Sequence, residues 1–173
     1  MTEFTKVIAV SEIPPQGRTM HFESTVEERI AIAARAKIPD VDSFAIELQL
    51  QFLPQSHILE IKGFGRAKIT QVCVVTLEPF EAELNFDFDC QCLESERAKK
   101  WNNEMDSVED YAQGGFEEVI DGKVDIGEIA VQEFILALDP YPHKPGARAD
   151  LDAANQASGE DNPFSVLKSL KKQ

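Results

Sequence analysis

Apolar and polar side chains alternate along two stretches of the chain, 59–77 and 82–92. In the first stretch the odd positions are apolar or small, and only Gln71 interrupts the series. In the second the even positions are apolar. Because successive side chains of a strand point to opposite faces of a sheet, the pattern predicts strand, turn and strand with one buried face. The opposite face of the second strand is polar and consists of Glu83, Asn85, Asp87, Asp89 and Gln91.

A third alternating stretch, 44–52, comes just before these two, and short connections join all three. Successive alternating strands with short turns predict an antiparallel meander. Shorter strands are expected at 4–10 and 18–22. Between them and the meander, Ser24 and Thr25 precede two glutamates at the spacing of a capping box, so a helix is expected over 26–37.

A second helix is predicted over 126–138. Asp125 is a good N-cap, with Glu128 three residues further on, and the following residues are apolar nearly all round. Such a helix is buried, so we expect it to pack on the sheet. The expected fold class is α+β, an antiparallel β-meander packed by about two helices.

The remaining segments lack a periodic pattern. Residues 93–120 are rich in charged and small polar side chains and are expected to form a mobile acidic excursion, with a short helix near 94–100. We expect one domain over 1–146, a flexible linker over 147–161, and a short tethered helix over 162–173. Three apolar residues share one face of that helix: Phe164, Leu167 and Leu170. A helix this short must dock on its own domain or on a partner.

The chain is acidic, with 17 Lys+Arg against 31 Asp+Glu and a formal net charge of −14. This balance opposes binding to a phosphate backbone, which depends on Lys and Arg, and favours a basic protein as partner. No stretch is long and apolar enough for a membrane span, and the first residues do not resemble a signal peptide. The three cysteines suit a reducing compartment, so we expect a cytoplasmic protein.

Two groups of residues suggest chemistry. Cys90 and Cys92 face the same side of a strand, but the histidines are single and scattered, so buried apolar thiols explain the pair better than zinc does. Asp87, Asp89 and Glu133 are the carboxylates that a metal-dependent nuclease would use, although the sequence does not place them together. We therefore assign no catalytic residue, no metal ligand and no cofactor.

Three blocks of the sequence resemble the YceD family, the large ribosomal RNA subunit accumulation proteins. They are 67–80, 125–145 and 162–171. Many family members have C-x-x-C where this chain has Cys73-Val-Val-Thr76, and the form seen here resembles the alphaproteobacterial branch. The absence of the second cysteine argues against a metal or redox role for the pair. The residues that carry the resemblance are Cys73, Thr76, Pro79, Phe80, Asp125, Glu133, Pro142, Asn162 and Pro163.

The resemblance implies a factor in large ribosomal subunit biogenesis that supports accumulation or processing of 23S rRNA without being an enzyme. The expected partner is a basic large-subunit ribosomal protein or a pre-ribosomal particle, and direct RNA contact stays open. An rRNA-processing nuclease is the alternative. The residues expected to bind the partner are Glu81, Glu83, Asp87 and Asp89 on the sheet, and Phe164, Leu167, Leu170 and Lys171 in the tail.

Overall fold

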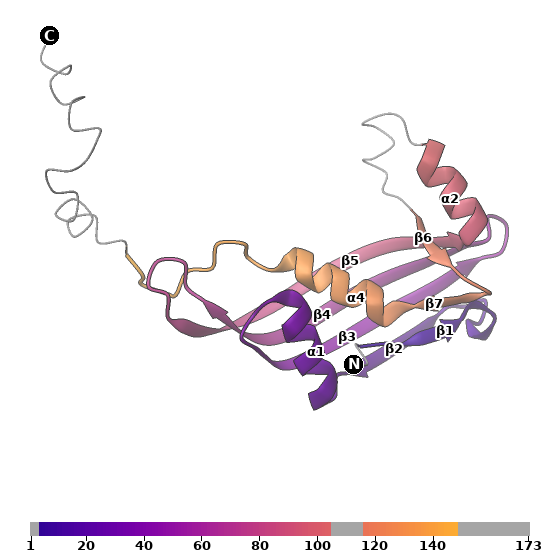
Figure 1. The fold of residues 1–173 in the computed structure, drawn as a ribbon. Coiled ribbons are helices and arrows are strands. Elements are labelled where there is room, and N and C mark those ends of the chain that lie inside the picture. Colours follow the sequence, from indigo (N-terminus) through magenta and orange to yellow (C-terminus); the bar gives the residue numbers. More distant parts are fainter. Residues whose placement is uncertain (1–3, 105–115, 149–173) are drawn as a thin grey trace, which may run out of the picture.

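The computed structural model describes residues 4–104, with side chains up to residue 100, and residues 116–148 (Figure 1). Their main element is a five-stranded sheet with the order β2-β3-β4-β5-β6. Its strands are β2 (Arg18–Glu23), β3 (Asp40–Leu53), β4 (Ile58–Val72), β5 (Pro79–Glu94) and β6 (Phe116–Val119). Strands β2 to β5 pair antiparallel, which confirms the predicted meander, and β6 pairs parallel with β5.

Helices and a two-stranded sheet complete the α+β fold. The helices are α1 (Val26–Ala36), α2 (Ser95–Glu104) and α4 (Ile126–Ala137), with a 3₁₀ turn η1 (Val10–Glu12). The second sheet pairs β1 (Val7–Ala9) with β7 (Lys123–Asp125) antiparallel. Helices α1 and α4 and this small sheet pack on the same face of the large sheet (Figure 1). We call this the inner face and the opposite, exposed one the outer face.

Phenylalanine rings fill the centre of the inner face. The ring of Phe44 on β3 meets Phe4 edge-on at 5.1 Å between ring centroids and Phe134 of α4 at 5.4 Å. Phe86 of β5 stacks beside Phe44 at 6.2 Å. Since aromatic pairs gain energy beyond their buried area, this cluster joins the N-terminus, the sheet and α4 into one core.

Two glycines on β4 make room for rings of β5. A Cβ atom added at Gly63 would lie 2.1 Å from the ring of Phe88, and one at Gly65 would lie 2.0 Å from the ring of Phe86. The β4–β5 ladder runs through both glycines without a register shift. These residues therefore mark close packing inside a regular strand.

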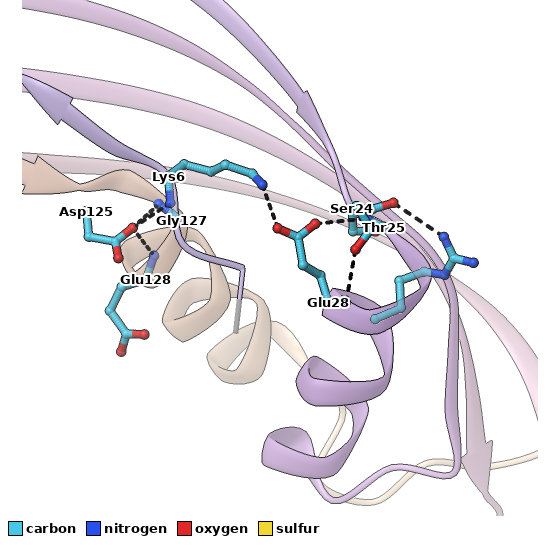
Figure 2. A network of polar contacts seen from close by, with 8 residues as sticks. Lys6, Ser24, Thr25, Glu28, Asp125, Gly127 and Glu128 are labelled. Atoms are coloured by element: carbon cyan, nitrogen blue, oxygen red, sulfur yellow. Dashed lines mark hydrogen bonds and ion pairs between the residues drawn. The ribbon is translucent and has the colours of Figure 1, made fainter. Parts of the chain in front are cut away.

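Both predicted helix starts are confirmed. Thr25 and Glu28 form a reciprocal capping box at the start of α1. Asp125 accepts hydrogen bonds from the N–H groups of Gly127 and Glu128 at the start of α4, and also from the N–H of Lys6 (Figure 2). The ammonium group of Lys6 in turn lies 2.6 Å from Glu28. The N-terminal segment thus ties the two helix starts together.

The structure differs from the sequence-based expectation mainly in the segment 93–120. Helix α2 confirms the short helix expected near 94–100, but strand β6 was not expected, and residues 105–115 lie outside the described residues. Strand β6 extends the large sheet beyond β5, which the mixed sequence Phe-Glu-Glu-Val did not indicate. The first strand, expected over 4–10, is the three-residue β1. Among the described residues, no helix is long and apolar enough to cross a membrane.

Candidate functional site

The acidic residues predicted on β5 lie on the outer face of the sheet. All four, Glu81, Glu83, Asp87 and Asp89, are exposed, whereas Phe86 and Phe88 between them are buried on the inner face. The strand period predicted from the sequence produces this separation directly.

A row of basic residues on β4 runs beside the acidic row. Lys62 lies opposite Asp89, and Lys68 lies opposite Glu83 with 3.4 Å between their charged groups. Arg66 lies opposite the neutral Asn85. Two of the four predicted carboxylates therefore have a cation directly across the ladder.

The other two carboxylates face uncharged residues. Asp87 lies opposite Phe64, and Glu81 lies opposite Thr70. The guanidinium group of Arg66 lies 5.2 Å from the centroid of the Phe64 ring, a cation–π distance. Glu81 and Asp87 are therefore the least compensated acids of the predicted set along the β4–β5 ladder.

The carboxylates of the nuclease alternative do not come together. Asp87 and Asp89 point to the outer face, whereas Glu133 lies on α4, which packs on the inner face. The sheet separates them, so they do not form one metal site. Residues 4–100 and 116–148 contain no group of three or more His, Cys, Asp or Glu side chains suited to hold a metal ion.

The two described blocks of the predicted family motif meet at one end of the molecule. We call residues 73–78 the Cys73 turn and residues 139–147, which follow α4, the exit segment. The N–H of Val74 donates to the carbonyl of Pro142 at 2.9 Å, and the ammonium group of Lys144 lies 2.8 Å from the carboxylate of Glu78. The turn itself is closed by hydrogen bonds from Cys73 N to Glu78 O and from Leu77 N to Cys73 O.

Gln71 adds a third link between β4 and the exit segment. It is the one polar residue in the apolar series of β4, and it is buried. Its side-chain amide donates to the carbonyl of Asp139 at 3.5 Å. The interruption in the sequence pattern therefore marks a contact with the main chain of the exit segment.

The thiol of Cys73 is the centre of the turn. It is buried, which by itself would raise its pKa, but hydrogen bonds from the backbone of Lys144, from Thr76 and from the backbone of Val75 outweigh this effect and lower its pKa to about 6. The N–H of Thr76 lies 3.5 Å from the sulfur. Cys73 and Thr76 thus hold the turn and the exit segment around one buried sulfur.

The other described residues of the predicted motif have structural positions. Pro79 and Phe80 begin β5, and Asp125 caps α4. Glu133 is half-buried on α4. The pKa of Glu117 on β6 is raised, mainly by the burial of Glu117 and secondly by the negative charge of Glu133. Asn162 and Pro163, like the predicted contacts Phe164, Leu167, Leu170 and Lys171, lie outside the described residues.

Sequence reasoning did not identify the ion pair of Glu78 with Lys144. Both residues belong to blocks that carried the resemblance, but 66 positions separate them and nothing local relates one to the other. Cys90 and Cys92, by contrast, were expected to be buried apolar thiols on one face of β5; Cys92 is buried, and Cys90 is only half-buried. The hydrogen bond with the neighbouring Cys90 and, second, burial raise the pKa of Cys92.

Comparison with known protein families gives a match over most of the chain. The model of a family described as large ribosomal RNA subunit accumulation protein YceD matches residues 61–171. No curated protein and no solved structure matches the chain. The matched range includes most of β4 together with β5, the Cys73 turn, α4 and the exit segment.

Proposed function

The chain belongs to the YceD family of large ribosomal RNA subunit accumulation proteins, and we propose that it acts there as a cytoplasmic binding factor rather than as an enzyme. Its family places it in the accumulation of large-subunit rRNA. The finer proposal is that it holds a basic ribosomal protein, or a pre-ribosomal particle that displays one, and so supports 23S rRNA accumulation. Charge complementarity of this kind gives fast and selective association.

The observation that carries the proposal is the pair of outer-face carboxylates that have no cation directly opposite them on β4. Glu81 and Asp87 are exposed, and each faces an uncharged residue across the ladder. The protein as a whole has a net charge of −14, so its long-range field attracts cations. A rigid antiparallel sheet presents these charges at fixed spacing, which lowers the entropic cost of binding.

The basic row on β4 supports direct RNA binding less well. Phe64 and Arg66 would suit stacking on a base, but Lys62 and Lys68 each have a carboxylate directly opposite. A phosphate group placed on these lysines would be repelled by Asp89 and Glu83. The mixed charges of the outer face therefore favour a protein surface over a nucleic-acid backbone.

The test is affinity purification of the tagged full chain from its native cell, at low and at high salt, with identification of the recovered proteins and RNA. We expect a basic large-subunit ribosomal protein, or precursors of the large subunit, to be enriched at low salt and lost at high salt. The double variant Glu81→Gln/Asp87→Asn is expected to reduce this recovery several-fold.

A matched control removes the same charge elsewhere. Glu12 and Asp121 are both exposed and lie in η1 and in the turn before β7, and Asn tolerates the positive φ of 50° at Asp121. Glu12→Gln/Asp121→Asn should leave the recovery unchanged. An equal loss of partner recovery in both variants would mean that only the net charge matters and would contradict the role of Glu81 and Asp87. If the wild-type chain recovers neither a ribosomal protein nor RNA, the proposal as a whole is contradicted.

A further inference from the structure

The Cys73 turn, the end of β4 and the exit segment lie at one end of the molecule (Figure 1), and several of their apolar side chains are exposed. Nine large hydrophobic residues are exposed among the described residues, and five of them belong to this end. They come from the end of β4, the Cys73 turn, the last turn of α4 and the exit segment: Val72, Val74, Leu77, Leu136 and Tyr141. Leu77 is 76% exposed and Tyr141 is 70% exposed, so nothing in the described structure covers them.

Main-chain hydrogen bonds bring most of these residues together. The bond from Val74 N to Pro142 O places the Cys73 turn beside Tyr141 and Pro142. Leu77 N donates to Cys73 O within the same turn. We call Val72, Val74, Leu77 and Tyr141 the exit-end patch.

Acidic residues border this patch on the outer face. Val72 pairs with Pro79, and the next outward pair along the ladder is Thr70 with Glu81. Glu81, Glu83 and Asp42 line a hollow of about 230 Å³ there, together with Lys68. The patch is therefore apolar at its centre, with a carboxylate-rich border.

We propose that the exit-end patch is the docking site of the chain's own segment 162–173. Its sequence, Asn-Pro-Phe-Ser-Val-Leu-Lys-Ser-Leu-Lys-Lys-Gln, has the complementary pattern. Phe164, Leu167 and Leu170 follow at helical spacing and supply one apolar face for the patch. Three lysines, Lys168, Lys171 and Lys172, supply the positive charge for the acidic border.

The position of the exit segment supports this occupant over any other. The described chain ends at Arg148, directly after the segment that the Cys73 turn holds. Residues 149–161 are mostly polar and small, and a flexible linker of about 13 residues has a root-mean-square span of about 20 Å. Such a tether holds the segment near the patch at an effective concentration on the order of millimolar. The family model covers the patch and residues 162–171 of this segment.

The test uses the full chain alone, labelled with ¹⁵N, and measures backbone order parameters of residues 164–170 at two protein concentrations. Docking predicts order parameters close to the rigid value of about 0.85, independent of concentration. In the variant Leu77→Asn/Tyr141→Ser they should fall below about 0.6. Leu77 has a positive φ of 59°, which Asn adopts more readily than Leu, so this change does not threaten the turn.

A matched control changes two equally exposed apolar residues away from this end. Val7 and Ile120 are 55% and 59% exposed, and Thr keeps their branched shape. Val7→Thr/Ile120→Thr should leave residues 164–170 ordered. Low order parameters in the wild-type chain would overturn the proposal, as would order that survives Leu77→Asn/Tyr141→Ser. If residues 164–170 become ordered only at the higher protein concentration, the segment docks on a second copy of the chain, and this result would also overturn the proposal. These order parameters are measured on the chain alone, so a failure of docking leaves the proposed basic partner of the outer face to its own purification test.

Discussion

At the scale of single residues, two glycines of β4 decide whether the phenyl rings of β5 can pack against that strand. Gly63 and Gly65 leave space for two phenyl rings, and an added methyl group would lie about 2 Å from ring carbons. Elsewhere in a strand, Ala is favoured over Gly because it loses less conformational entropy on folding. Here the steric conflict with buried rings opposes that gain, and the rings have little room to move in a close-packed interior.

Gly65→Ala is therefore expected to destabilise the protein by about 1–3 kcal/mol, the usual range for overpacking a core. Urea unfolding followed by circular dichroism measures the change. Asn85→Ala, on the exposed position opposite Arg66, serves as the control and should change stability by less than about 0.5 kcal/mol. A neutral or stabilising Gly65→Ala would show that Phe86 can shift without cost.

Cys73 makes stability depend on pH. Its pKa in the folded protein is about 6, below the value of 9.0 for a free thiol. A group with a lowered folded-state pKa stabilises the fold fully above its unfolded pKa and loses this contribution as the pH falls through the folded one. The difference in unfolding free energy between the wild type and Cys73→Ala should therefore grow as the pH rises from 6 to 9.

Thiolate absorbance at 240 nm checks the same group directly. The wild-type chain should show one thiol titrating near pH 6, and this step should be absent in Cys73→Ala. It should persist in Cys92→Ala, because the pKa of Cys92 is raised. A wild-type chain with no thiolate below pH 8 would contradict the hydrogen-bonded thiolate in the Cys73 turn.

At the scale of elements, strands with a long alternating pattern could be predicted from the sequence, whereas very short strands could not. The meander was predictable because β3, β4 and β5 each keep a period of two over many residues. Strands β1 and β7 have three residues each, too few for a period, and their pairing joins segments more than a hundred positions apart. In strand β6 two adjacent glutamates interrupt the alternation of apolar and polar residues, so the sequence did not indicate a strand at the edge of the sheet.

The candidate site was predictable to a similar degree. Exposure of the acids on β5 followed from the strand period, but their cations on β4 depended on the register between two strands. Likewise, Gln71 was visible as an interruption of the apolar series, whereas its partner, the carbonyl of Asp139, could only be seen in three dimensions. Local pattern gives the direction of a side chain, and tertiary packing gives its neighbours.

Helices α1 and α4 are joined by a two-pronged ion pair. Both guanidinium nitrogens of Arg35 lie 2.6 Å from the carboxylate of Glu128, and Gln132 donates to the same group. The hydrogen bonds from Arg35 lower the pKa of Glu128 to about 2 against the opposing effect of burial. Because both side chains are partly exposed, solvent screening limits the gain to about 1 kcal/mol.

Glu128→Gln should therefore lower the unfolding free energy by about 1 kcal/mol at pH 7. The folded-state pKa is lowered, so the difference from wild type should shrink as the pH falls from the ordinary value of 4.5 toward 2. Chemical unfolding at a series of pH values measures it. Glu27→Gln, another first-turn glutamate, is the control; a pH-independent difference for Glu128→Gln would exclude the ion pair as its cause.

At the scale of the whole molecule, the family match covers only part of what folds. The matched residues begin at Ile61, inside β4, whereas α1, β2 and β3 come before it. Strands β2 and β3 form one side of the large sheet, and β3 supplies Phe44, the centre of the aromatic cluster. The range that the family model matches and the folding unit of this chain therefore differ in extent.

A fragment that begins at Ile58 is expected not to fold. It would expose the edge of β4 over its whole length and leave Phe86 and Phe134 without Phe44. Far-ultraviolet circular dichroism should show a largely disordered chain, with no cooperative thermal transition, while the full chain shows one. A cooperative transition in the fragment would mean that the second half has a sufficient core of its own.

The pairing of β1 with β7 also sets an order of events during synthesis. Val7 pairs with Asp125, and the N–H of Lys6 bonds to the Asp125 side chain, so β1 has no partner until residue 125 has been translated. The hairpins of the meander need only neighbouring sequence and can pair as they leave the ribosome. Strand β1 is therefore synthesised before the meander but takes its place in the fold after it.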